Sequence, residues 1–173
     1  MIFNYMSSNW EPTRLDEEIL RDGAISMYHN LKILEEDIKN LSNYNYRIID
    51  IDVSNWTLET LHPNLKEILD FPDYYGENLN AFADCLNDMY NKRFSGVIIV
   101  FRHFDNLVGN DKSECEGLLD VIASISRQWL ISDQRLISLV QSDDPDIFFE
   151  KIGGYHPSWN AAEWFDDNRK KDR

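Results

Sequence analysis

One uninterrupted apolar run constrains the fold of this 173-residue chain more than any other feature. Residues 97–101 read Val-Ile-Ile-Val-Phe, directly after Gly96. Such a run is typical of a central strand in a parallel sheet, because helices cover both of its faces. Residues 46–53 instead alternate between apolar side chains and aspartates, which predicts a strand with one polar side at a sheet edge.

The segments between the expected strands have the periodicity of helices. Apolar residues at three- and four-residue steps predict helices over 57–69, 77–90 and 115–130, and a short strand follows at 136–140. Pro63 indicates a break or offset within the first of these helices. Strands joined by long helical crossovers are parallel, so the apolar second strand is expected in the middle. The sequence therefore predicts an α/β fold with a three-stranded parallel sheet in the order 1-2-3, packed with helices.

Both ends of the chain differ from this middle part. Apolar residues recur at four- and three-residue steps from Leu20 to Leu41, which predicts one long N-terminal helix. Its apolar stripe favours packing onto the domain, with a coiled-coil dimer seam as the alternative. The aromatic C-terminal part is expected to pack on the domain and to fray from residue 167. We therefore expect an N-terminal helical extension over 1–45, a central domain over 46–141 and a C-terminal extension over 142–173.

Composition narrows the classes of partner. The net charge is −14, from 31 acidic and 17 basic side chains, and the isoelectric point is about 4.5. Nucleic acids and anionic lipids would be repelled, whereas a basic protein would be attracted. No apolar run is long enough to span a membrane, and the N-terminus lacks the pattern of a secretory signal. We therefore expect a cytoplasmic protein that binds neither nucleic acid nor membranes.

The sequence offers little for catalysis or metal binding. Its four histidines are scattered, and it contains no HExxH, no paired CxxC and no glycine-rich phosphate loop. Cys85 and Cys115 are too few for a disulfide framework and are expected to be buried free thiols. A hydrolase that used Glu77 and Asp84 would need a cleft, which a convex helix face does not provide. We expect no catalytic residues, no metal site and no cofactor.

An acidic stretch over residues 70–90 is the strongest candidate for a functional surface. It contains five carboxylates and no Lys or Arg, and Tyr74 and Tyr75 precede its helix. Charged residues at helical spacing usually form only a solvated surface, which is the simpler interpretation. Paired tyrosines beside carboxylates without a local counter-charge favour instead a docking surface for a cationic partner.

Three short motifs carry a family resemblance. Residues 74–79 read Tyr-Tyr-Gly-Glu-Asn-Leu, residues 84–86 read Asp-Cys-Leu, and residues 101–105 read Phe-Arg-His-Phe-Asp. Together they resemble the barstar family of small intracellular ribonuclease inhibitors, over about residues 46–140. The resemblance implies a three-stranded parallel sheet in sequential order with helices packed on it.

The resemblance also implies a mechanism. In that family the acidic helix and the loop before it block the ribonuclease active site, and the aspartate that matches Asp84 occupies the phosphate-binding pocket. Ribonucleases bind phosphates with cationic side chains, so carboxylates at the right spacing can take the same positions without being cleaved. The expected partner-binding residues are Tyr74, Tyr75, Gly76, Glu77, Asn78, Asn80, Ala83, Asp84, Asn87 and Asp88.

Several positions depart from the best-known family member. Asn80 replaces a second carboxylate, Ala83 and Met89 replace contact tryptophans, and residues 124–128 contain no counterpart of a late acidic contact. Because such anchors carry most of the energy of an interface, these differences predict a different cognate ribonuclease. We expect a bacterial immunity protein, monomeric when free, that neutralises a ribonuclease toxin. The alternative is a scaffold protein that dimerises or docks through the apolar N-terminal stripe.

Overall fold

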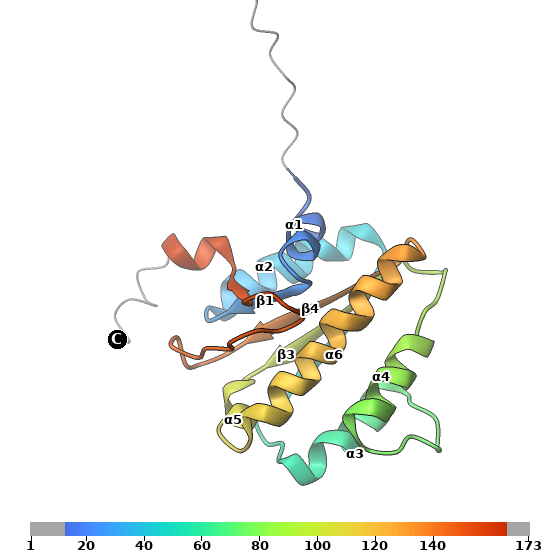
Figure 1. The fold of residues 1–173 in the computed structure, drawn as a ribbon. Coiled ribbons are helices and arrows are strands. Elements are labelled where there is room, and N and C mark those ends of the chain that lie inside the picture. Colours follow the sequence, from blue (N-terminus) through green and yellow to red (C-terminus); the bar gives the residue numbers. More distant parts are fainter. Residues whose placement is uncertain (1–12, 166–173) are drawn as a thin grey trace, which may run out of the picture.

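Five parallel strands form one sheet in the computed structural model, which describes residues 13–165. The strand order is β2-β3-β4-β1-β5 (Figure 1). All four neighbouring pairs are parallel. The strands are β1 (Ile25–Tyr28), β2 (Tyr46–Asp52), β3 (Gly96–Arg102), β4 (Arg135–Gln141) and β5 (Ser158–Trp159).

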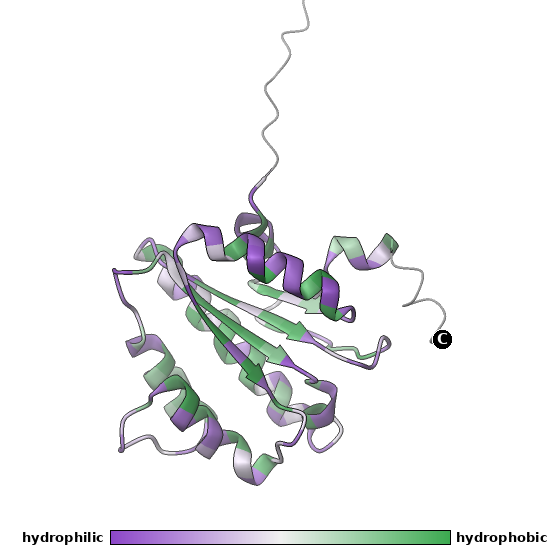
Figure 2. Ribbon diagram, turned by 180° about the vertical axis from the view of Figure 1, so that it is seen from behind, coloured by the Kyte–Doolittle hydropathy of each residue, from purple (hydrophilic) through white to green (hydrophobic). Residues whose placement is uncertain are grey.

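Helices cover both faces of this sheet (Figures 1 and 2). One core cluster lies between the sheet and the layer of α3, α4 and α6, and a second lies between the sheet and the layer of α1 and α2. The helices are α1 (Leu15–Arg21), α2 (Leu31–Leu41), α3 (Leu58–Leu69), α4 (Leu79–Asp88), α5 (Asp105–Val108) and α6 (Lys112–Ile131), with short 3-10 helices η1 (Ser42–Tyr44) and η2 (Ala161–Phe165).

The apolar run in β3 is explained by these two layers. Val97 and Ile99 belong to the cluster beneath α3, α4 and α6, whereas Ile98 and Val100 belong to the cluster beneath α1 and α2. Each of these side chains is at most 3% exposed. The predicted interior position of this strand is confirmed, and β2 lies at a sheet edge as its alternation predicted.

The prediction of three strands is wrong, because the sheet continues beyond β4. β2, β3 and β4 are neighbours in the predicted order, but β1 and β5 add two strands from the ends of the chain. β1 pairs with β4, with Ile25 opposite Ser138, and β5 pairs with β1, with Met27 opposite Trp159. The two terminal segments are therefore part of the same sheet.

The prediction of one long N-terminal helix is also wrong. The segment forms α1, β1 and α2, because Gly23 and Ala24 adopt positive φ angles of 102° and 69° that end the helix. Met27, Leu34 and Leu41 are at most 2% exposed, so the expectation that these apolar residues pack onto the domain is confirmed. A four-residue strand is too short to show alternation, and its apolar residues happened to continue the helical spacing.

α3 continues through Pro63 without the predicted break. The helix starts with a reciprocal capping box between Thr57 and Thr60, and it ends at Asp70 in the left-handed conformation. Pro63 removes one intrahelical hydrogen bond on an exposed side of the helix. Leu61 and Leu65 are fully buried, and their packing stabilises the helix enough to offset this lost hydrogen bond.

The described C-terminal segment is attached through a buried carboxylate. Glu163 in η2 is 1% exposed, and its Oε1 accepts hydrogen bonds from the backbone N–H groups of His29 and Asn30, each at 2.9 Å. Because these groups lie at the start of α2, the negative charge also suits the helix dipole. Phe149 adds an aromatic side chain that is 3% exposed in the main core. The predicted frayed end, from residue 167, lies outside the described residues.

Replacing Glu163 by alanine is expected to lower the free energy of unfolding by about 2 kcal/mol, because two backbone donors lose a charged acceptor. Limited proteolysis should then cut the C-terminal segment sooner than in the unchanged protein. Glu150→Ala, an exposed glutamate of the same segment, is the matched control. Equal proteolysis of the two variants would contradict the role assigned to Glu163.

Candidate functional site

α4 presents its apolar side to the core and its polar side to solvent. Phe82 and Leu86 are fully buried, and Cys85 is 5% exposed. The helix starts at Leu79, two residues later than predicted, because Asn78 is its N-cap and accepts the N–H of Ala81 at 3.0 Å. The opposite side of the helix is therefore exposed, and the N-cap fixes where the helix starts.

The loop before α4 is held by local hydrogen bonds. The side chain of Asn78 also donates to the carbonyl of Gly76 at 2.8 Å, and the N–H of Tyr75 donates to the carbonyl of Pro72 at 2.9 Å. Glu77 adopts a positive φ of 50°, a backbone conformation that residues other than glycine rarely adopt. Strained residues of this kind persist where the surrounding structure fixes them, and they are frequent at binding sites.

The two adjacent tyrosines have opposite environments. Tyr74 is 78% exposed, whereas Tyr75 is 5% exposed and packs against Phe71 with ring centroids 5.0 Å apart. The hydroxyl of Tyr75 is hydrogen-bonded to Nδ1 of His62, and Nε2 of His62 lies 3.2 Å from Oε1 of Glu114. Burial raises the pKa of Tyr75, so its hydroxyl stays protonated. Tyr74 therefore offers a contact surface, while Tyr75 ties the loop to α3 and α6.

Replacing Tyr75 by phenylalanine is expected to lower the free energy of unfolding by about 1 kcal/mol, because the ring stays packed but Nδ1 of His62 loses its hydrogen-bond partner. Replacing Tyr74 by phenylalanine should change that free energy by less than about 0.5 kcal/mol, since the side chain is exposed. Urea unfolding of both variants measures the difference. A larger loss for Tyr74 than for Tyr75 would contradict the assignment.

The ten residues predicted to bind a partner lie on this one continuous segment. Eight are exposed, Ala83 is partly exposed, and Tyr75 is buried beneath the loop. In the described part of the chain, Asp84 has no ion-pair partner. The exposed residues are Tyr74, Gly76, Glu77, Asn78, Asn80, Asp84, Asn87 and Asp88.

Basic residues do occur at the margin of this surface, although none lies within residues 70–90. Nζ of Lys66 in α3 is 3.7 Å from Oδ1 of Asp73. Arg47 in β2 lines a shallow hollow of about 190 Å³ together with Asp70 and Asp88. The assumption that the acidic stretch has no local counter-charge therefore fails at these margins, because α3 and β2 come from elsewhere in the sequence.

A neighbouring hollow was missed by sequence reasoning. It has a volume of about 180 Å³ and lies where α4 meets α6, with Asn87, Tyr90 and Gln128 among its lining residues. Trp129 also lines it and packs edge-on against Tyr90, with ring centroids 6.1 Å apart. No pattern within either helix shows that these two helices are neighbours. The hollow extends the exposed surface of α4 with polar side chains.

Other chemistry finds no support in the described residues. No group of three or more His, Cys, Asp or Glu side chains that could hold a metal ion occurs among residues 13–165. Cys85 and Cys115 are buried and form no disulfide. Burial raises the pKa of Cys115 to about 12, and burial together with Asp88 and Asp84 raises the pKa of Cys85. Both thiols are therefore poor nucleophiles. None of the described helices is long and apolar enough to cross a bilayer.

Comparison with known proteins identifies the family. The family model described as "Barstar (barnase inhibitor)" matches residues 46–142, which is more than half of the chain. The chain belongs to the barstar family. A Bacillus subtilis (strain 168) protein named "Putative ribonuclease inhibitor YrdF" is 40% identical over 65 residues, which cover 38% of this chain and 68% of that protein.

A solved structure gives a much weaker likeness. A chain from "Structure of Drosophila ORC bound to AT-rich DNA and Cdc6" matches with a TM-score of 0.47 and 15% identity. The match covers 74% of this chain and 43% of that chain. The barstar match, in contrast, contains β2, β3 and β4, the three strands that were predicted in sequential order. It also contains the acidic loop and α4, whereas β1 and β5 lie outside it.

Proposed function

We propose that this barstar-family protein inhibits a basic ribonuclease by placing α4 and the loop before it in the active site of the enzyme. The observation that carries this proposal is the exposure of Asp84, without an ion-pair partner among the described residues, on a helix whose start is fixed by Asn78. Family membership and the name of the B. subtilis relative support the same function.

Rigidity favours tight binding through this surface. Tyr75 anchors the loop from below, and Asn78 links the loop to the helix, so little conformational freedom is lost when a partner binds. The net charge of −14 attracts a basic enzyme over long distances. Asp84 then offers a carboxylate to side chains that would otherwise hold a phosphate.

The differences from the best-known family member point to a different target. Ala83 and Met89 stand where that member has tryptophans, and neither is aromatic. Met89 is also partly buried against the core, so it offers little contact area to a partner. The exposed Tyr74 and the hollow beside Gln128 are the contacts on this surface that can compensate. We propose that the target is a ribonuclease toxin and that the inhibitor acts in the bacterial cytoplasm as an immunity protein. We also propose residues 46–141 as the inhibitory domain, with 1–45 and 142–173 as extensions.

The scaffold alternative has lost the surface on which it depended. Its apolar stripe between Leu20 and Leu41 does not form one helix, and its members Ala24, Met27, Leu34 and Leu41 are buried. No other observation favours that role. A monomeric state of the free protein, and the lack of binding to nucleic acid or membranes, stay predictions from its charge.

An inhibition assay tests the proposed function. The full chain is added to a panel of small basic ribonucleases, which includes a barnase-type enzyme and any candidate toxin of the same bacterium, and RNA cleavage is measured. We expect one member of the panel to be inhibited at a one-to-one ratio, with weaker inhibition at higher salt. Full activity of every enzyme at saturating inhibitor would overturn the proposal.

A further inference from the structure

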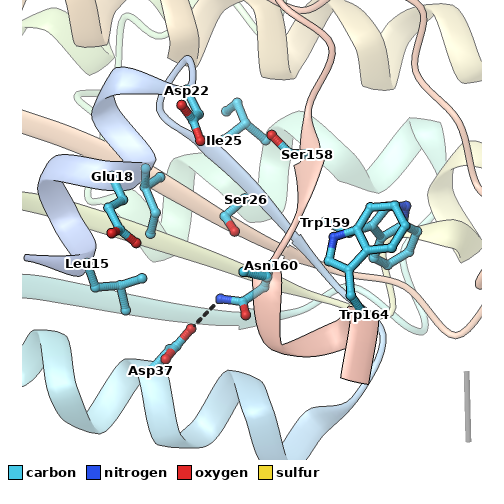
Figure 3. Close-up of a pocket in the computed structure, with 12 residues that line it drawn as sticks. Leu15, Glu18, Asp22, Ile25, Ser26, Asp37, Ser158, Trp159, Asn160 and Trp164 are labelled. Atoms are coloured by element: carbon cyan, nitrogen blue, oxygen red, sulfur yellow. Dashed lines mark hydrogen bonds between the residues drawn. The ribbon is translucent and has the colours of Figure 1, made fainter. Parts of the chain in front are cut away.

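A second candidate site lies at the other edge of the sheet from α4. A cavity of about 260 Å³ opens between α1, α2 and the C-terminal segment that contains β5 and η2 (Figure 3). Glu18 from α1 and Asp37 from α2 point into this space, and Trp164 lies on its opposite side. Among residues 13–165, no lysine or arginine lines the cavity. The family match starts only at residue 46 and ends at 142, so all of these residues lie outside it.

Asp37 is the central group of this cavity. It is partly buried, and its Oδ2 accepts hydrogen bonds from the hydroxyl of Tyr28 at 2.9 Å and from Nδ2 of Asn160 at 2.6 Å. In the described part of the chain it has no cationic partner. A carboxylate that is partly removed from water is normally compensated by a cation. Asp37 is therefore held in a fixed position by two hydrogen-bond donors, without an ion-pair partner among the described residues.

The other walls suit a flat organic cation. Glu18 is exposed at the cavity mouth, and Asp22 lines the cavity near it. Among the described residues Asp22 pairs with Arg21, whose Nε is 3.5 Å from its Oδ1, and both of these side chains are exposed. Indole rings attract cations through their faces, most strongly when water is excluded. Carboxylates on one side and the indole of Trp164 on the other thus border a space that favours positive charge.

We propose that this cavity binds the guanidinium group of an alkylguanidinium ligand. A guanidinium is planar, stacks on aromatic rings and forms two parallel hydrogen bonds to a carboxylate, whereas an ammonium is compact and strongly hydrated. Asp37 provides the fixed carboxylate, and Trp164, which is 65% exposed, provides a ring at the mouth. Free metabolites such as agmatine and arginine side chains on a protein share this chemistry. The proposal does not depend on ribonuclease inhibition, because the cavity and α4 are at opposite edges of the sheet (Figure 1).

Calorimetric titration of agmatine into the full chain, at constant ionic strength, tests this proposal. We expect saturable binding at one site, and weaker binding of butylamine, which carries an ammonium. Asp37→Asn keeps the shape of the side chain and should weaken agmatine binding by about tenfold, because one charge-assisted hydrogen bond is lost. Glu36→Gln removes the same charge from an exposed neighbour on α2 that does not line the cavity, and it should weaken binding far less than Asp37→Asn.

The outcomes separate a site from general attraction to an acidic protein. Lack of saturation, or an equal effect of Glu36→Gln and Asp37→Asn, would overturn the proposal. Should Asp37→Asn fail to fold, Glu18→Gln decides in its place, because Glu18 is exposed and its loss should also weaken binding. A capped Gly-Arg-Gly peptide distinguishes the sources, since tighter binding than agmatine assigns the site to a protein side chain. Tighter binding of agmatine assigns it to a free ligand.

Discussion

Replacing Asp84 by alanine is expected to weaken inhibition of the cognate ribonuclease at least about thirtyfold, the effect of losing a central interface residue. The side chain is exposed and contributes no ion pair among the described residues, so the fold does not depend on it. The free energy of unfolding should change by less than about 0.5 kcal/mol. Inhibition constants and urea unfolding of the same preparation measure both quantities.

A matched variant separates the local contact from the general charge of the protein. Glu36→Ala removes one negative charge from an exposed position on α2, on the other side of the sheet from α4. It should slow association slightly at low salt and leave the dissociation rate unchanged. If Asp84→Ala and Glu36→Ala weakened inhibition equally, α4 would not be the inhibitory surface.

Replacing Asp16 by alanine is expected to lower the free energy of unfolding by about 3 kcal/mol or more, as for other broken buried ion pairs. Asp16 in α1 is fully buried, and its carboxylate accepts hydrogen bonds from Arg14 at 2.8 Å and from the hydroxyl of Tyr46 at 2.6 Å. Nε of Arg135 lies 4.0 Å away. The variant leaves the buried hydroxyl of Tyr46 without this partner and separates α1 from the start of β2. Glu17→Ala, an exposed neighbour, is the control.

The contribution of Asp16 should also depend on pH in a defined direction. Burial alone would raise its pKa, but the hydrogen bonds from Tyr46 and Arg14 and the positive charges nearby lower it overall. A carboxyl group whose pKa is lower in the folded state stabilises the fold above its unfolded pKa, which is about 3.9. That contribution is lost as the pH falls through the folded pKa. The stability difference between the unchanged protein and Asp16→Ala should thus be constant near neutral pH and shrink below about pH 4. A difference independent of pH down to acid unfolding would contradict this account.

The central part of the fold was predictable because its signals are local. The apolar run of β3, the alternation in β2 and the periodic helices each need only a short window of sequence, and the family resemblance implied the order of the three strands that the sheet shows. β1 and β5 have four and two residues, and they are strands only because β1 pairs with the open edge of β4 and β5 pairs with β1. Asp16 and Glu163 are read from sequence as ordinary surface carboxylates. Their partners, Tyr46 and the start of α2, are 30 or more positions away.

The candidate site shows the same division. The motif from Tyr74 to Asn78 located the loop, and helical spacing identified the outward side of α4. Neighbouring tyrosines look equivalent in sequence, and only the position of His62 beneath the loop shows that Tyr75 is buried. The hollow beside Gln128 and the cation Lys66 come from α6 and α3, so their proximity to α4 depends on how the helices pack.

Competition with a nucleotide tests the central claim most directly. Binding of the full chain to its cognate ribonuclease is measured by calorimetry at increasing concentrations of a mononucleotide that occupies the phosphate-binding pocket of the enzyme. If Asp84 takes the place of a phosphate, the apparent dissociation constant should rise in proportion to the concentration of nucleotide, as it does for two ligands that exclude each other. An affinity that does not change with saturating nucleotide would show that the inhibitor binds away from the active site.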